Sequence, residues 1–157
     1  MTSKHILKLF VGIAIAAAVS TVVADEDFDP QPIIEGRQSA LRDIGAAFKG
    51  INDEFKKSSA SLPLIRQYAR QIDDLSRQQQ RWFPAGTGRE SDIETAARPE
   101  IWRQPTQFKA GQAAFREQVE KLVQVAAGDD LAAIRSQAQV LGKACKSCHD
   151  RFREKDD

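Results

Sequence analysis

The sequence predicts an all-α protein folded as an antiparallel four-helix bundle. Apolar residues recur at spacings of three and four along four long stretches, and no stretch alternates as a strand would. One long and two short connections separate the four stretches, which is typical of an antiparallel bundle. The 157 residues suit one domain, and 41% apolar with 29% charged residues is typical of a soluble globular protein.

The first 24 residues are expected to form a cleaved signal peptide. Lys4 and Lys8 give a positive start, an apolar run over residues 9–19 follows, and small residues precede an acidic segment at 25–27. A membrane anchor is the competing interpretation, but the run is shorter than the roughly 20 residues that span a bilayer. We therefore expect export, cleavage after Ala24, a mature domain of residues 25–157 and no membrane association after processing.

The first two helices are predicted from their apolar stripes. The first helix, over about residues 33–57, carries Ile34, Leu41, Ile44, Phe48, Ile51 and Phe55 on one face. Arg37 interrupts this stripe. The second helix is expected to begin with Ser61 as N-cap and Pro63 in its first turn, and to stop before Pro84.

Residues 84–104 lack helical periodicity and form the long connection, which border aromatic residues are expected to pin against the bundle. The third helix is predicted to start at Pro105. Gly128 and Asp129 are expected to end this helix and to N-cap the fourth. The apolar face of the fourth helix consists of Leu131, Ile134, Ala138, Leu141, Cys145, Cys148 and Phe152.

The segment from Cys145 to His149 reads Cys-Lys-Ser-Cys-His, the C-x-x-C-H signature of covalent haem attachment. Residues three apart on a helix share a face, so both thiols project inward and can add to the two porphyrin vinyl groups. The adjacent imidazole can ligate the iron from the same side. We predict one covalently bound haem c, with His149 as the axial iron ligand.

Three other interpretations of the cysteine pair fit the sequence less well. A redox dithiol of the thioredoxin type lies at the start of a helix beside a strand, whereas this pair lies near the end of an all-helical chain. A structural disulfide is compatible with export. A zinc site would lack ligands, because the mature chain contains no further cysteine or histidine.

The composition also bears on the second axial position of the iron. Electron-carrying haems usually have methionine or a second histidine there. The single methionine, Met1, and the second histidine, His5, both lie in the predicted signal peptide. Lysine or water are the remaining candidates, and an apolar interior disfavours a charged lysine. We therefore expect a five-coordinate, high-spin iron that is open to small neutral diatomic molecules.

These residues resemble those of the cytochrome c′ family over essentially the whole mature chain. The resemblance is strongest at residues 37–41, 97–102 and 145–153. It implies a periplasmic four-helix bundle in which the C-terminal helix holds a high-spin haem c. It also implies a homodimer formed through the first two helices.

The resemblance further implies roles for three residues. Leu41 would cover the distal face of the iron, where low-spin relatives carry a methionine ligand; it could equally be an ordinary core residue. Arg37 would lie near a haem propionate, with a snorkelling arginine as the alternative. Arg153 would lie on the proximal side beside the imidazole, with a solvated cation at the helix end as the alternative.

The predicted function is binding of nitric oxide or carbon monoxide, and the resemblance implies a role in nitric oxide scavenging or tolerance. The alternative is an electron-transfer cytochrome with an unidentified periplasmic redox partner. No enzyme activity is expected, because peroxidase chemistry normally needs a polar, proton-relaying distal pocket. The net charge is +1 for the whole chain and −1 without the two lysines of the predicted signal peptide, so it gives no reason to expect a nucleic-acid or membrane partner.

Overall fold

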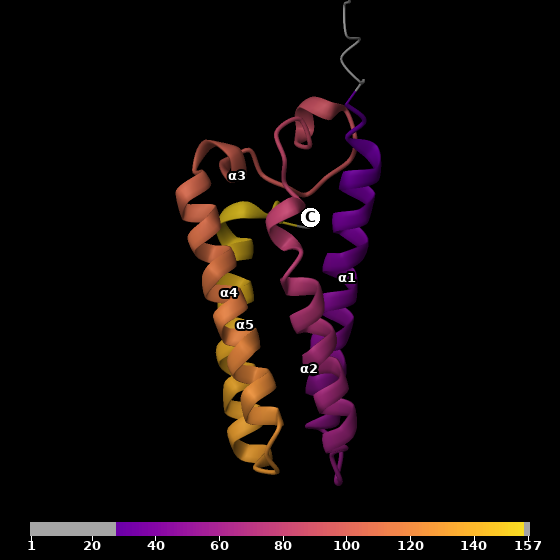
Figure 1. Cartoon of the computed structure of the whole chain (residues 1–157), viewed down its shortest axis with the longest axis vertical. Coiled ribbons are helices and arrows are strands. Elements are labelled where there is room, and N and C mark those ends of the chain that lie inside the picture. The colour runs from indigo at the N-terminus through magenta and orange to yellow at the C-terminus, as the bar shows by residue number, and fades with distance from the viewer. Residues whose placement is uncertain (1–27, 156–157) are drawn as a thin grey trace, which may run out of the picture.

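The computed structural model describes residues 28–155, so the predicted signal peptide lies outside the described residues. The elements in this range are α1 (Gln31–Glu54), α2 (Leu62–Ser76), η1 (Gln79–Arg81), η2 (Arg89–Ser91), α3 (Glu100–Arg103), α4 (Pro105–Ala126) and α5 (Leu131–Phe152). Figure 1 shows α1 and α2 as one pair of long helices and α4 and α5 as another, with their ends joined above by the connection between α2 and α3. This arrangement confirms the predicted all-α bundle. No helix in the described range is long and apolar enough to cross a membrane.

Three predicted helix boundaries are wrong. The first helix ends at Glu54 rather than near residue 57. The second helix ends at Ser76 rather than near Pro84. The Ser76 hydroxyl donates to the carbonyl oxygen of Asp73 at 2.8 Å, a local bond that competes with helix propagation. The N-cap of α5 is Asp130 rather than Asp129, and its carboxylate accepts from the amides of Ala132 and Ala133. The neighbouring carboxylate of Asp129 instead accepts a hydrogen bond from Arg66 at 2.7 Å.

The main core lies where the apolar faces of the four long helices meet. Ile51, Ile65, Leu122 and Ile134 are each 0% exposed, so every long helix contributes a fully buried residue. The predicted stripes of α1, α2, α4 and α5 therefore face inward over most of their length, with Leu41 of α1, at 42% exposure, as an exception. Hydrophobic burial of this kind is the main source of the stability of the bundle.

Truncating the centre of this core is expected to lower the free energy of unfolding by about 2–5 kcal/mol. The test is Ile51→Ala, because Ile51 is fully buried and its loss leaves a cavity between helices. The matched control is Leu64→Ala on α2, where the side chain is 37% exposed, with an expected loss of about 1 kcal/mol or less. Chemical denaturation of the holoproteins measures both; equal losses would contradict the assignment of the core.

A smaller aromatic cluster closes the other end of the bundle. Ring centroids of Phe83 and Phe108 lie 5.0 Å apart and those of Phe108 and Phe152 lie 5.1 Å apart, both in edge-to-face geometry. The indole nitrogen of Trp102 donates to the carbonyl oxygens of Phe83 and Pro84. These contacts hold the borders of the long connection against α4 and α5, as the sequence predicted.

The turn between α1 and α2 is closed by a buried carboxylate, that of Glu54. It accepts a hydrogen bond from the backbone amide of Ser61 at 2.9 Å and pairs with the ammonium group of Lys57. The hydrogen bonds from Lys57 and Ser61 lower the pKa of Glu54. A carboxylate with a lowered pKa stabilises the fold above its unfolded-state pKa, and this contribution is lost as the pH falls through the folded-state value.

Glu54→Gln is therefore expected to lower the melting temperature at pH 7, because the amide cannot replace the charged pair. The difference from the unsubstituted protein should narrow as the pH falls below the ordinary glutamate pKa of about 4.3. The control is Glu117→Gln, which removes an exposed ion pair with Lys121. Because solvent screens this pair, the melting temperature of the control should change little. Thermal melts between pH 3 and pH 7 give both curves; a pH-independent difference for Glu54→Gln would contradict this assignment.

Candidate haem attachment site

The two cysteines lie on the inward face of the last third of α5. Cys145 packs against the main core and Cys148 against the aromatic cluster, and both are free, partly buried thiols. Gly111 of α4 faces the second thiol: a methyl group placed on this glycine would lie 3.6 Å from the Sγ atom of Cys148. The shared face agrees with the spacing argument from the sequence.

The electrostatics of the thiols differ from those of a redox dithiol. Burial raises the pKa of Cys145 to about 11 and also raises the pKa of Cys148. Redox-active C-x-x-C thiols usually have lowered pKa values, which helix N-termini or nearby cations produce. Both cysteines are therefore protonated at neutral pH, which tells against thiol–disulfide exchange as their function.

His149 follows directly on the exposed side of the same turn. Partial burial lowers the pKa of its imidazole, the positive charge of Arg153 lowers it further, and Asp150 acts in the opposite direction. The neutral imidazole is the form that ligates a metal. The backbone amide of Arg153 also donates to the carbonyl oxygen of His149 at 3.0 Å, so the structure brings this predicted pair together.

Two contacts fix how α1 lies against α5. The guanidinium of Arg135 donates to the carbonyl oxygen of Phe55 at 2.7 Å. A methyl group placed on Gly142 would lie 3.3 Å from the Cζ atom of Phe48. The helices are antiparallel, and both contacts give one register: seven residues along α5 correspond to seven residues back along α1. Extended two turns further, about 10.5 Å along the axis, this register predicts that Leu41 lies level with His149.

Leu41 differs from its neighbours on the apolar stripe of α1. Its side chain is 42% exposed, whereas Ile34 and Ile51, on the same stripe, are 0% exposed. An exposed leucine at the predicted level of His149 is compatible with a haem that packs its apolar face against α1. The distal role of Leu41 itself stays a prediction.

Arg37 is buried, with 2% of its surface exposed, and lies one turn before Leu41. Its Nη1 donates to Thr87 Oγ1 at 2.9 Å and to the carbonyl oxygen of Trp82 at 3.3 Å. Its Nη2 donates to the carbonyl oxygen of Thr87 at 2.7 Å and to Thr95 Oγ1 at 2.8 Å. These four bonds use all four Nη hydrogens of the guanidinium, so only the Nε hydrogen would remain to donate to a haem propionate. The predicted propionate contact stays a prediction.

Thr87 and Thr95 are the residues of this region that the sequence analysis missed. Thr87 is 0% exposed and supplies two of the acceptors for Arg37. A signal was present, because a charged residue on an apolar stripe must find hydrogen-bond acceptors when it is buried. The separation of 50 residues between donor and acceptor left their identity open.

The donor set fits a covalently attached haem. Two thiols on one helix face and an adjacent imidazole are the groups that thioether formation and iron ligation require. In residues 28–155, no cluster of three or more His, Cys, Asp or Glu side chains could hold a separate metal ion. The chemistry of these three residues therefore points to haem rather than to a bare ion.

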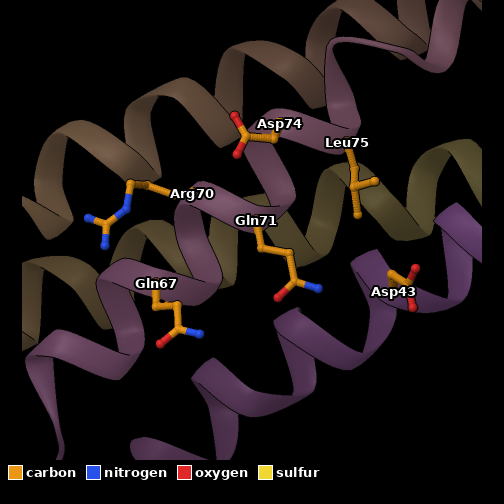
Figure 2. A pocket seen from close by; sticks show the side chains of 6 residues that line it. All are labelled: Asp43, Gln67, Arg70, Gln71, Asp74 and Leu75. Atoms are coloured by element: carbon orange, nitrogen blue, oxygen red, sulfur yellow. The ribbon is translucent and has the colours of Figure 1, made fainter.

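A polar surface pocket lies elsewhere, between α1 and α2. Figure 2 shows Asp43 of α1 facing a row of α2 side chains; the lining residues are Asp43, Gln67, Arg70, Gln71, Asp74 and Leu75. None of the predicted haem-site residues contributes to it. The pocket therefore belongs to the outer face of the first helix pair and not to the candidate site.

Known proteins resemble the chain over its whole described fold. A family model described as "Cytochrome C'" matches residues 32–153. A cytochrome c′ from Alcaligenes xylosoxydans is 32% identical over 127 residues, which are 80% of this chain and 96% of the relative. The solved cytochrome c′ of Shewanella frigidimarina superposes with a TM-score of 0.74 at 26% identity, over 81% of this chain and 98% of that one.

Two solved structures of variants of the Alcaligenes xylosoxidans cytochrome c′ are also similar, each at 29% identity and over 98% of its own chain. One is a ferrous variant with bound nitric oxide, with a TM-score of 0.73 over 82% of this chain. The other is a variant with bound carbon monoxide, with a TM-score of 0.72 over 81% of this chain.

Proposed function

Because the chain belongs to the cytochrome c′ family, we propose that it is a periplasmic haem protein whose iron binds nitric oxide and carbon monoxide opposite His149. The family carries one covalently attached haem c, and the two cysteines of this chain are its attachment points. The observation that carries the proposal is the absence of a second strong ligand. Between residues 25 and 157 the sequence has no methionine and no histidine other than His149.

Each site residue has a distinct role in this proposal. Cys145 and Cys148 form the thioethers and fix the plane of the macrocycle, and His149 supplies the proximal imidazole. Leu41 covers the opposite face, where its apolar side chain excludes water and admits small neutral molecules at a steric cost. The cationic Arg153 lies beside His149 and favours the neutral imidazole. The haem supplies the iron on which the diatomic ligand binds.

The relatives support the choice of ligand. Variants of a cytochrome c′ that is 29% identical to this chain have been solved with nitric oxide and with carbon monoxide. Both ligands are small and uncharged, which suits an apolar distal face. The proposed role is nitric oxide scavenging or tolerance, which requires binding but no enzymatic reaction.

Titration of the anaerobic ferrous protein with nitric oxide tests the proposal. The expected result is a Soret shift that saturates at one ligand per haem, with carbon monoxide giving a second, distinct spectrum. Electron paramagnetic resonance of the nitric oxide complex reports whether the bond between His149 and iron breaks. A ferrous spectrum that neither gas changes would contradict the proposed function.

Electron transfer is the less favoured function. An iron whose coordination changes on reduction reorganises more than a six-coordinate one, and the chain lacks the methionine that a fast carrier uses. Stopped-flow reduction measures the rate of electron transfer to the iron directly. Rapid electron transfer, together with no binding of nitric oxide or carbon monoxide, would favour electron transfer over gas binding as the function.

Export and dimer formation complete the proposal. The signal peptide would be removed after Ala24, so mass spectrometry of the periplasmic protein should give an N-terminus at Asp25. A homodimer would form through α1 and α2, and sedimentation equilibrium should give twice the mature mass. A retained leader or a monomer at micromolar concentration would contradict the respective statement.

A further inference from the structure

The connection over residues 84–99, which we call the strap, spans from α1 to the end of α5. Figure 1 shows it crossing above the bundle between these helices. The strap is the long connection of the sequence analysis without its last residues, which form α3. One set of hydrogen bonds holds residues 87–95 of the strap to α1, and another holds residues 96–98 to the end of α5.

On the α1 side, Arg37 holds the strap. Its Nη groups bind Thr87 and Thr95, and its guanidinium carbon lies 4.8 Å from the ring centroid of Phe83. The next residue, Gln38, donates its side-chain amide to the carbonyl oxygen of Glu94 at 2.9 Å. Burial lowers the pKa of Arg37 and the nearby Glu90 opposes this shift, but an arginine stays charged under these conditions.

On the α5 side, backbone hydrogen bonds hold the strap to the residues that follow His149. The amide of Arg98 donates to the carbonyl oxygen of Phe152 at 3.0 Å, and the amide of Glu154 donates to the carbonyl oxygen of Ala96 at 2.8 Å. These bonds flank the antiparallel bridge between Ala97 and Arg153. The strap thus pairs with the chain three to five residues beyond the proposed iron ligand.

The position of these hydrogen bonds matters because the direct contacts between α1 and α5 lie elsewhere along the bundle. The contacts at Phe48 and Phe55 lie toward the opposite end of the bundle from Leu41 and His149. The principal neighbours of α1 and α5 are α2 and α4, respectively. At the level of the candidate haem site, the strap therefore links the two helices that would face the two sides of the macrocycle.

From this geometry we infer that Arg37 and Thr87 are positioning residues, which fix the separation of α1 from the end of α5 through the strap. This fixed separation limits how easily the side chain of Leu41 can move aside for an entering diatomic ligand. The inference rests on the proposed function, which supplies the diatomic ligand. It goes beyond that function by assigning the residues that control how the ligand reaches the iron. Arg37 lies one helical turn from Leu41, so any rotation or displacement of α1 at Arg37 also moves the leucine.

Thr87 offers the cleanest test, because its hydroxyl both accepts from Arg37 and donates to the carbonyl oxygen of Pro84 at 2.8 Å. Thr87→Val keeps the shape and removes both bonds, and Thr87→Ser keeps both. In the ferrous holoprotein, Thr87→Val should raise the association rate of carbon monoxide about two- to tenfold, the range expected if the free energy of one of the two lost hydrogen bonds had opposed entry of the ligand. Thr87→Ser should retain the original rate.

A second readout needs no gas. Hydrogen exchange of the Arg98 and Glu154 amides in the ligand-free holoprotein should be faster in Thr87→Val and unchanged in Thr87→Ser. If Thr87→Val does not fold, Thr95→Val and Thr95→Ser provide the same comparison, since Thr95 Oγ1 also accepts from Arg37.

The outcomes separate the two proposals. If the unsubstituted protein binds no carbon monoxide, the proposed function fails, and the exchange data still test the strap. If the valine variant melts at a lower temperature but binds carbon monoxide at the original rate, Arg37 and Thr87 only stabilise the fold and the inference is overturned. Unchanged amide exchange in the valine variant would overturn it as well.

Discussion

Cys148→Ser is expected to remove most of the covalently bound haem. Its thiol is one of the two groups on the inward face of α5 that can form a thioether, and a serine hydroxyl does not add to a porphyrin vinyl group in its place. Cys145→Ser should behave in the same way, and the double variant should carry no covalent haem. Intact mass spectrometry and haem staining after denaturing electrophoresis measure the attached fraction.

The matched control lies between the two cysteines. Ser147 is exposed and on the outer side of α5, so Ser147→Ala should load with haem as the unsubstituted protein does. A fully loaded Cys148→Ser protein would contradict the assignment of the attachment site. Equal loss of haem in Ser147→Ala would show that the helix, rather than the thiols, had been damaged.

Leu41→Met is expected to convert the ferric iron from high spin toward low spin. The register between α1 and α5 predicts that residue 41 lies level with His149, and a thioether there could provide the sixth ligand that the mature sequence lacks. If nine-tenths of the ferrous iron also became six-coordinate, the apparent affinity of the ferrous protein for carbon monoxide would fall about tenfold. Optical and electron paramagnetic resonance spectra measure the spin state, and gas titration measures the affinity.

Leu64→Met provides the control for the Leu41 substitution. Leu64 is an exposed leucine on α2, at 37% exposure, so a methionine there should leave spin state and gas binding unchanged. Should Leu41→Met also leave both unchanged, Leu41 would not lie above the iron. The register between α1 and α5 would then need another interpretation.

The four long helices could be predicted from the sequence because each one buries most of an apolar stripe. The haem attachment residues were equally accessible, since a short motif carries the whole donor set within five residues. Both features depend on neighbours along the chain. Spacing alone therefore indicated which side of the last helix faces inward.

Features that depend on distant or competing contacts were harder to predict. The apolar pattern gave no reason to end α2 at Ser76, where a side-chain hydrogen bond competes with the helix. Two adjacent aspartates could each cap α5, and they are distinguished by the contact of Asp129 with the distant Arg66, which leaves Asp130 as the cap. The acceptors of Arg37 lie 45 to 58 residues away, in a segment without periodicity.

The most direct test of the open iron site is the spectrum of the purified ferric holoprotein at neutral pH. The absence of methionine and of a second histidine from residues 25–157 predicts five-coordinate, high-spin iron in both the optical and the electron paramagnetic resonance spectrum. A low-spin spectrum at neutral pH would show that another group occupies the position opposite His149, and would contradict gas binding at an open iron.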